Sequence, residues 1–343
     1  MNSNTLSIVV VTYNSARYID NCLSCLSQAA HYSGIPVEIL VVDNASTDDT
    51  KARIASQSGI RVIENTTNLG FGAAANRGIF QAHGTWIMVV NPDTTCDTHF
   101  LQVLMKDVTP YTTHLINPLI LRPDATVNAA GLIVHYTGIA VCNGLGAAPA
   151  HFSRVATMPV ASPSGAAIIA HRQVWTALRG FDEEYFLYME DVDLGLRAQS
   201  LGYECVCLPS ATIYHDYALR LTPAKLYYLE RNRLMMIHKL YSHELRRRIA
   251  WSLRIVAALA AISAALHGWA YWKAFTKAHQ HPFTSPLPTR DFPPLTHILP
   301  TMARELPLEV SDSPWVRAGL RCFNRVFYRL LSGRQSTPKP QTR

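Results

Sequence analysis

The sequence predicts an α/β fold in which a mostly parallel sheet is flanked by helices and followed by a helical extension. Three observations support this prediction. Short apolar runs alternate with helical patterns in the first part of the chain, which is typical of βαβ units. Polar residues directly follow several of these runs, as they do at the ligand-binding edge of such a sheet. Beyond residue 240 the pattern changes to apolar, proline-rich and basic stretches.

Four apolar runs in the first half predict strands that are buried on both faces of a parallel sheet. They cover residues 7–12, 37–43, 60–63 and 86–90. A helix of small residues is expected after a glycine-rich turn, over residues 73–83. Because ligands bind at the carboxyl ends of parallel strands, Asp43, Asn91 and Asp93 are candidate binding residues.

In the second half of the chain, strand and helix patterns alternate less regularly. Residues 115–164 combine prolines and glycines with short β-like pieces, and they predict an irregular insert that covers a sheet edge. Beyond it we expect strands over residues 166–170, 204–208 and 212–214, and helices over residues 172–178, 191–201 and 223–240. The sequence therefore predicts one domain over residues 1–240.

Residues 241–279 predict an apolar or amphipathic helical region. Their apolar run, residues 255–266, is shorter than the ~20 residues that a membrane span requires. Trp269, Tyr271 and Trp272 follow it, as aromatic residues do at a membrane–water interface. We expect a helix that lies on a membrane or packs against the domain, and not a span.

The C-terminal part predicts a linker, a basic helix and a tail. Many prolines mark residues 280–314 as a linker. Arginines four residues apart within residues 315–333 predict the charged stripe of an amphipathic helix that contacts a membrane or docks on the protein. Residues 334–343 are expected to be a disordered tail.

Composition and charge indicate which partners to expect. Hydrophobic residues make up 48% of the 343 residues and charged residues 16%, which favours contact with a membrane surface. The net charge of +7 lies in residues 313–343, which hold seven Lys or Arg and no Asp or Glu. Such a tail suits anionic lipid better than a nucleic acid, so no nucleic-acid partner is expected.

The seven cysteines indicate no disulfide framework. Cys22 and Cys25 have the spacing of a redox or zinc half-site, but they lie in a helical pattern without a second pair, so we interpret them as core residues. The N-terminal apolar run is too short for a signal peptide. We therefore expect a cytoplasmic protein, bound peripherally to the inner face of the cytoplasmic membrane.

Carboxylates and large apolar side chains are interleaved over residues 181–193. Acids among aromatic residues have raised or split pKa values, which proton transfer requires. Asp191 and Glu190 are therefore candidate catalytic residues. Together with Asp93 and with His215, which ends a later strand, they suggest a metal-assisted transfer enzyme.

Several motifs occur in order along residues 7–14, 41–48, 68–76, 91–93 and 181–193. They read Ser-Ile-Val-Val-Val-Thr-Tyr-Asn, Val-Val-Asp-Asn-Ala-Ser-Thr-Asp, Asn-Leu-Gly-Phe-Gly with Asn76, Asn-Pro-Asp, and Phe-Asp through Glu-Asp-Val-Asp. With these motifs the chain resembles inverting glycosyltransferases of family 2, which have the Rossmann-like GT-A fold. Within the family it is most similar to the bacterial rhamnosyltransferase-type enzymes of cell-envelope polysaccharide assembly. The resemblance covers roughly residues 5–240.

The resemblance implies a nucleoside-diphosphate sugar donor, with dTDP-rhamnose as the first candidate, and a lipid-linked or polysaccharide acceptor. It also implies which residues bind the donor. These are Thr12, Tyr13, Asn14, Asp43, Asn68, Gly70, Asn76, Asn91 and Arg231.

The resemblance further implies a metal and a base. Asp93 corresponds to the last acid of the family's Asp-x-Asp metal motif and His215 to a further ligand, for Mg²⁺ or Mn²⁺. Asn91 stands at the first position of that motif, so a lower metal affinity is expected. Asp191 corresponds to the base that accepts the acceptor's proton, with Glu190 beside it, in a single displacement that inverts the anomeric configuration.

Ordinary structural roles are alternatives for these residues. Asp191 could cap a helix, and Asp43 or Asp93 could close a turn. His215 could be a strand-end histidine without a ligand, and Arg231 could be a surface charge.

Two other functions also have some support. Residues 70–75 have the form G-x-G-x-x-A, with Asp93 about 20 residues beyond, which imitates the fingerprint of an NAD(P)-dependent oxidoreductase. The fingerprint would have to lie in the first βα unit, and here it lies in the third. A membrane-associated GT-A scaffold protein without turnover is the second alternative, and Asn91 is its only support.

Overall fold

The structure is a computed structural model that describes residues 5–216, 220–281 and 292–305, together with residues 321 and 324. The predicted basic helix over residues 315–333 and the tail over residues 334–343 lie almost entirely outside these residues.

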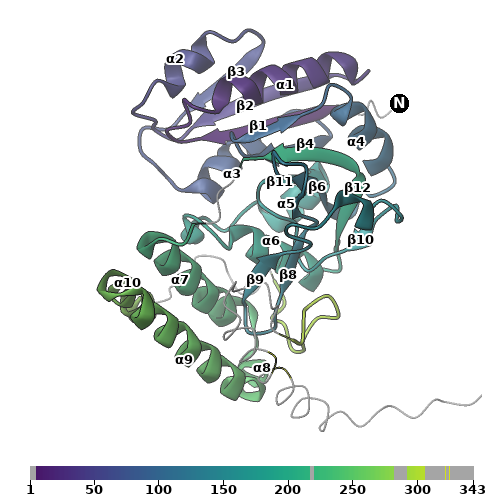
Figure 1. The fold of residues 1–343 in the computed structure, drawn as a ribbon. Helices are drawn as coiled ribbons and strands as arrows, with labels where there is room; N and C mark the ends of the chain where they lie inside the picture. Colours follow the sequence, from purple (N-terminus) through teal and green to yellow (C-terminus); the bar gives the residue numbers. More distant parts are fainter. Residues whose placement is uncertain (1–4, 217–219, 282–291, 306–320, 322–323, 325–343) are drawn as a thin grey trace, which may run out of the picture.

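The predicted parallel sheet is present in the first half of the chain (Figure 1). β1 (Leu6–Thr12) pairs in parallel with β2 (Val37–Asp43) and with β4 (Trp86–Val90), and β2 pairs in parallel with β3 (Ile60–Glu64). Apolar, mostly β-branched residues fill β1, β2 and β4, because both faces of the sheet are covered. The helices α1 (Ile19–Tyr32), α2 (Thr50–Ala55) and α3 (Phe71–Gln81) connect these strands.

Beyond β4 the sheet continues with strands of both directions. The strand order is β10-β12-β6-β11-β4-β1-β2-β3, and β5 and β7 pair beside this path. β11 (Ala167–His171) is antiparallel to both β4 and β6 (His114–Leu121), whereas β12 (Glu204–His215) is parallel to β6. The two short strands predicted over residues 204–214 are therefore one strand with a shift of register between Leu208 and Thr212.

The prediction of an irregular insert over residues 115–164 is wrong for its first part, because β6 is a central strand of the sheet. Pro118 lies within β6, and a proline normally argues against a central strand because it cannot donate to the ladder. Here Pro118 stands opposite Leu208, where the register of β12 shifts and the regular ladder is interrupted. The remainder holds only short pieces: β7 (Val127–Ala129), β8 (Leu132–Val134), β9 (Ala140–Cys142), β10 (Met158–Pro159) and the 3₁₀ turn η1 (Pro149–His151).

Helices cover both faces of the sheet. α1 and α4 (Phe100–Val108) pack on one face, where Cys22 is buried and Cys25 packs at the margin, as interpreted from the sequence. α3, α5 (Arg172–Leu178) and α6 (Glu190–Ser200) pack on the other face. The alternation of side chains along β1 decides which core each residue enters, since Ile8 faces α1 and Val9 faces α3.

A third core holds the C-terminal elements. α7 (Pro223–Leu240) and α8 (His243–Arg248) pack there with Leu295, Leu299 and Met302, so residues 292–305 of the predicted linker are packed on the domain. α9 (Ala250–His267) and α10 (Trp269–Gln280) lie at the outer edge of this part (Figure 1). Among the described helices, α9 alone is long and apolar enough to cross a membrane, by length and composition only.

Candidate active site

Asp93 and His215 meet where strands of the sheet end. Asp93 lies between β4 and β5 (Thr94–Cys96), and β5 pairs with β12 so that Thr94 stands opposite His215. The carbonyl of Asp93 accepts a hydrogen bond from the N–H of Asp216 at 3.0 Å. As a result, Oδ1 of Asp93 lies 3.1 Å from Nε2 of His215. The two side chains that the sequence assigns to a metal thus point their donor atoms at the same place.

This pair fits a divalent cation. Oδ1 of Asp93 is buried, and beyond its contact with His215 it forms no hydrogen bond with a described residue. Adjacent ligands of an octahedral cation, each about 2.1 Å from it, stand about 3.0 Å apart, close to the separation found here. Nδ1 of His215 lies 3.5 Å from Oδ1 of the buried Asn128, and a proton on Nδ1 directed at that oxygen would leave the Nε2 lone pair for a metal.

The side chains supply only part of a coordination shell. Over the described ranges, no group of three or more His, Cys, Asp or Glu residues could hold a metal ion. Mg²⁺ and Mn²⁺ commonly complete such a shell with water and substrate phosphate. Two protein ligands therefore predict a site that binds metal tightly only together with a phosphate ligand.

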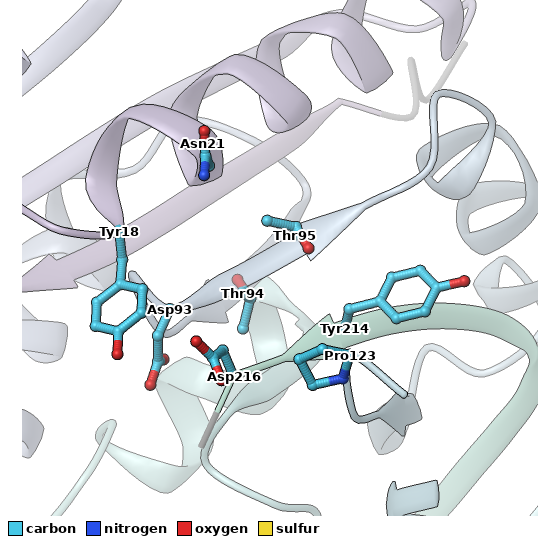
Figure 2. Close-up of a pocket in the computed structure, with 8 residues that line it drawn as sticks. All are labelled: Tyr18, Asn21, Asp93, Thr94, Thr95, Pro123, Tyr214 and Asp216. Atoms are coloured by element: carbon cyan, nitrogen blue, oxygen red, sulfur yellow. The ribbon is translucent and has the colours of Figure 1, made fainter. Parts of the chain in front are cut away.

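A cavity of about 350 Å³ opens beside Asp93 (Figure 2). Asp93 and Asp216 lie at one side of it next to Tyr18, and Thr94 and Thr95 of β5 lie along its edge. Its lining includes neither Asp43 nor Asp191. The cavity therefore borders Asp93 but is not a complete donor pocket.

Asp191 lies in the first turn of α6 and is linked to the Asp93 turn through the main chain of residues 165–166. The N–H of Gly165 donates to Oδ2 of Asp191 at 2.8 Å. The neighbouring carbonyl of Ala166 accepts from the N–H of Asn91 at 3.0 Å. Asp93 and Asp191 are thus held at one edge of the sheet. The N-cap residue of α6 is Met189, so the capping interpretation of Asp191 does not hold.

The pKa values of Glu190 and Asp191, at the start of α6, are both raised, and burial is the largest cause. For Asp191, hydrogen bonds from the N–H groups of Gly165 and Val192 oppose this rise in pKa. For Glu190, burial and the charge of Asp191 raise the pKa to about 8. The raised pKa values make these two neighbouring carboxyl groups better proton acceptors than exposed acids.

The pKa of Glu190 predicts a dependence of stability on pH that a Glu190→Gln variant removes. The folded protein holds this proton up to a pH of about 8, whereas an unfolded chain releases it near 4.5. The free energy of unfolding of the wild type therefore falls as pH rises through this window. We expect the melting temperature of Glu190→Gln, relative to wild type, to rise by several degrees between about pH 5.5 and about pH 8.5.

Differential scanning calorimetry at several pH values measures this difference. Glu183→Gln is the matched control, because Glu183 is an exposed acid of the same segment. The difference in melting temperature between Glu183→Gln and wild type is expected to be the same at every pH. If the difference for Glu190→Gln is also the same at every pH, the raised pKa of Glu190 is contradicted.

The loop before α6 is strained and is held by Asn232 of α7. Phe186, Tyr188 and Met189 have left-handed backbone, with φ values of 61°, 66° and 70°. Such conformations cost about 1–3 kcal/mol each and persist only where their surroundings hold them. The side-chain amide of Asn232 donates to the carbonyls of Tyr185, Leu187 and Tyr188 at 2.9, 2.8 and 2.6 Å. Asn232 therefore helps to position the start of α6, which carries Asp191.

Arg231 supports the same loop. Its Nη2 donates to the carbonyl of Glu184 at 2.9 Å, and its Nη1 donates to Oδ1 of Asn232 at 2.8 Å. The residue is 6% exposed, so it is not the surface charge of the alternative interpretation. Its contact with a donor remains a prediction.

Asp43 is fully buried at the end of β2. Its Oδ1 accepts from the hydroxyl of Thr12 at 3.2 Å and its Oδ2 from the N–H of Ser46 at 3.1 Å. Asn14 crosses to the same turn, since its N–H donates to Oγ of Ser46 at 2.9 Å. Tyr13 is 48% exposed beside them. These contacts close a turn, as the alternative interpretation states, and the nucleotide contact remains a prediction.

The loop after β3 approaches the loop before α6 at Gly70. Gly70 has φ of 86°, and a Cβ atom there would lie 2.5 Å from the carbonyl oxygen of Phe186, so only glycine fits. The amide of Asn68 accepts from the N–H of Gly70 at 2.9 Å. Both residues thus shape the loop, and their donor contacts remain predictions.

Asn76 and Asn91 occupy supporting positions. Both polar atoms of the Asn76 amide bond the main chain of Phe181, at 2.8 and 2.9 Å. The carbonyl of Asn91 accepts from the hydroxyl of Thr94 at 2.7 Å. Sequence reasoning missed Gly165 and Asn128, because no motif marks either of them. Asn232 follows Arg231 and was considered with it as a polar pair that faces the diphosphate.

Comparisons with known proteins agree with this arrangement. Residues 7–125 match the family described as Glycosyl transferase family 2, and residues 86–304 match Glycosyl transferase family group 2. The N-acetylglucosaminyl-diphospho-decaprenol L-rhamnosyltransferase of Mycobacterium tuberculosis is 29% identical over 243 residues, which are 63% of this chain and 77% of that protein. The O-antigen biosynthesis protein RfbC of Myxococcus xanthus is 29% identical over 202 residues, 53% of this chain and 15% of that protein.

Two solved structures are similar in fold. The structure of GalNAc-T7 with UDP, GalNAc and Mn²⁺ has a TM-score of 0.58 at 13% identity, and the match covers 81% of this chain and 55% of that chain. Mannosyltransferase PcManGT from Pyrobaculum calidifontis, in complex with GDP-Man and Mn²⁺, has a TM-score of 0.51 at 16% identity. This match covers 96% of this chain and 88% of that chain. At these identities the likeness establishes a shared GT-A-type fold.

Proposed function

We propose a reaction for this chain, which belongs to the glycosyl transferase family group 2 and is a glycosyltransferase. A sugar, with rhamnose as the first candidate, moves from a nucleoside-diphosphate donor to a lipid-linked glycan, with inversion at the anomeric carbon. The observation that supports it most is the shared position of Asp93, His215 and Asp191 at one sheet edge, joined through residues 165–166.

The chemistry assigns a role to each of these groups. The acceptor oxygen forms a bond to the anomeric carbon while the bond from that carbon to the donor's phosphate oxygen breaks. Asp191 accepts the proton of the acceptor hydroxyl, and Glu190 lies buried beside it. Asp93 and His215 would hold Mg²⁺ or Mn²⁺, and the cation would neutralise charge on the leaving diphosphate.

The relatives suggest the acceptor. The mycobacterial relative is named for a lipid-diphosphate-linked N-acetylglucosamine, and RfbC for O-antigen biosynthesis. We propose an acceptor of the same class, made during assembly of a bacterial cell-envelope glycan. A polyprenyl-linked acceptor remains in the bilayer, so the enzyme would act at the inner face of the cytoplasmic membrane.

A thermal-shift panel of sugar nucleotides, with and without Mn²⁺, tests this proposal. Ligand at about 100 times its Kd stabilises the folded state by about 2.7 kcal/mol, so one sugar nucleotide should raise the melting temperature by several degrees when Mn²⁺ is present. That nucleotide is then assayed for transfer to a polyprenyl-diphosphate N-acetylglucosamine. Stabilisation by NADH alone would favour the oxidoreductase, and donor binding without transfer or hydrolysis would favour the inactive scaffold.

A further inference from the structure

One side of α9 carries several exposed large apolar side chains. Trp251, Leu259, Ile262 and Leu266 are exposed, and so is Trp269 at the start of α10; Trp251, Leu266 and Trp269 are 72%, 82% and 77% exposed. At about 100° per residue, the four α9 positions fall within about 80° of the helix circumference. We call these five residues the α9 stripe. Large apolar side chains grouped in this way mark an interaction site.

A neighbouring side of α9 is attached to the protein. Ser252, Val256 and Ala264 are buried, and the hydroxyl of Tyr136 donates to Oγ of Ser252 at 3.0 Å. Tyr136 itself is a core residue. A helix that crossed a bilayer would have to leave these contacts, so the packing favours a helix that lies along a surface.

The charged residues around the α9 stripe indicate which kind of partner surface it would contact. Residues 241–281 hold six Lys or Arg and a single acid, Glu244. Arg247 and Arg248 are exposed just before α9, and the guanidinium of Arg254 lies 5.1 Å from the ring centre of Trp251. Basic residues beside exposed indole rings suit the headgroup region of an anionic bilayer. A second copy would bring two basic rims together, which opposes self-association.

The α9–α10 pair also contacts the catalytic elements. The hydroxyl of Tyr271 in α10 donates to the carbonyl of Leu221, close beyond His215 in the chain, at 3.1 Å. Nε2 of His279 in α10 lies 2.9 Å from Oε1 of Glu230 in α7, the helix that carries Asn232. A surface bound at the stripe is therefore held at a fixed position relative to the site.

We propose that the α9 stripe inserts into the headgroup–acyl boundary of an anionic membrane, with α9 parallel to the surface. This inference rests on the proposed function, because it explains how the site reaches an acceptor that stays in the bilayer. The stripe then raises the local concentration of lipid-borne acceptor and contributes nothing to the transfer chemistry itself.

Quenching of tryptophan fluorescence by brominated lipid tests the contact directly in the full chain. Vesicles of phosphatidylcholine with about one third phosphatidylglycerol should quench the wild type, and Trp251→Phe with Trp269→Phe should remove most of that quenching. Vesicles of phosphatidylcholine alone should quench the wild type much less. Unchanged quenching after loss of both indoles would overturn the proposal, whatever other segment binds lipid.

A triple variant, Leu259→Gln, Ile262→Gln and Leu266→Gln, tests the consequence. We expect at least a tenfold weaker binding to the anionic vesicles and a similar loss of transfer to vesicle-borne acceptor, with transfer to a short water-soluble acceptor unchanged. Ser263→Gln, exposed on the same helix outside the stripe, is the matched control. A dimer that the triple variant dissociates in the absence of lipid would instead identify a second copy as the occupant.

These outcomes separate the two proposals. Wild type that transfers sugar to the soluble acceptor but shows no stripe-dependent lipid binding keeps the proposed function and removes this inference. Wild type that binds lipid through the stripe but transfers no sugar removes the proposed function alone.

Discussion

Asp191→Asn is expected to lower kcat by about 10³-fold, within the range that general bases contribute, while the Kd of the sugar nucleotide changes less than about twofold. The amide keeps the shape of the side chain and can still face the N–H of Gly165 through its oxygen. It cannot accept the acceptor's proton. Rapid-quench transfer assays and calorimetric titration with the donor measure the two quantities separately.

Glu183→Gln is the control for this prediction, because Glu183 is an exposed acid of the same segment and should retain nearly full turnover. An Asp191→Asn variant that keeps more than about a tenth of the wild-type kcat would remove Asp191 as the base. Glu190, buried beside it with its pKa raised to about 8, would then be the remaining candidate.

Asp93→Asn is expected to weaken Mn²⁺ binding in the presence of donor by about 100-fold or more. Loss of a residue that only orients a ligand already costs about 10–100-fold in metal affinity, and Asp93 would be the single carboxylate in contact with the cation. The variant keeps the main-chain bond from Asp216 to residue 93, so the turn should fold. Titration of Mn²⁺ with bound nucleotide, followed by electron paramagnetic resonance, measures the change.

The matched control is Asp216→Asn, because Asp216 lines the same cavity but is not one of the paired donors. Its effect should be less than about tenfold, as expected for a charge outside direct contact. Identical Mn²⁺ titrations for Asp93→Asn and wild type would contradict the ligand role of Asp93, even if the variant lost activity for another reason.

The sequence predicted the positions of some site residues better than the roles of others. Asp93 follows β4 and His215 ends β12, and the pairing of β5 with β12 brings their side chains together. Arg231 and Asn76 were also predicted to bind the donor, but in the structure their side chains hold the main chain of the segment before α6. A polar residue that binds main chain and one that binds substrate look the same in a sequence, because both need a donor or an acceptor at a fixed point.

The sequence by itself determined the parallel half of the sheet and the polar residues at its carboxyl edge. Runs such as those of β1 and β2 are buried on both faces, so their composition alone indicates their environment. Only the tertiary structure decided that β6 is central despite Pro118, that Asn232 holds the strained loop, and that α9 has one attached and one exposed side. Each of these depends on a partner far away in the chain, and local patterns carry no information about which distant partner a segment meets.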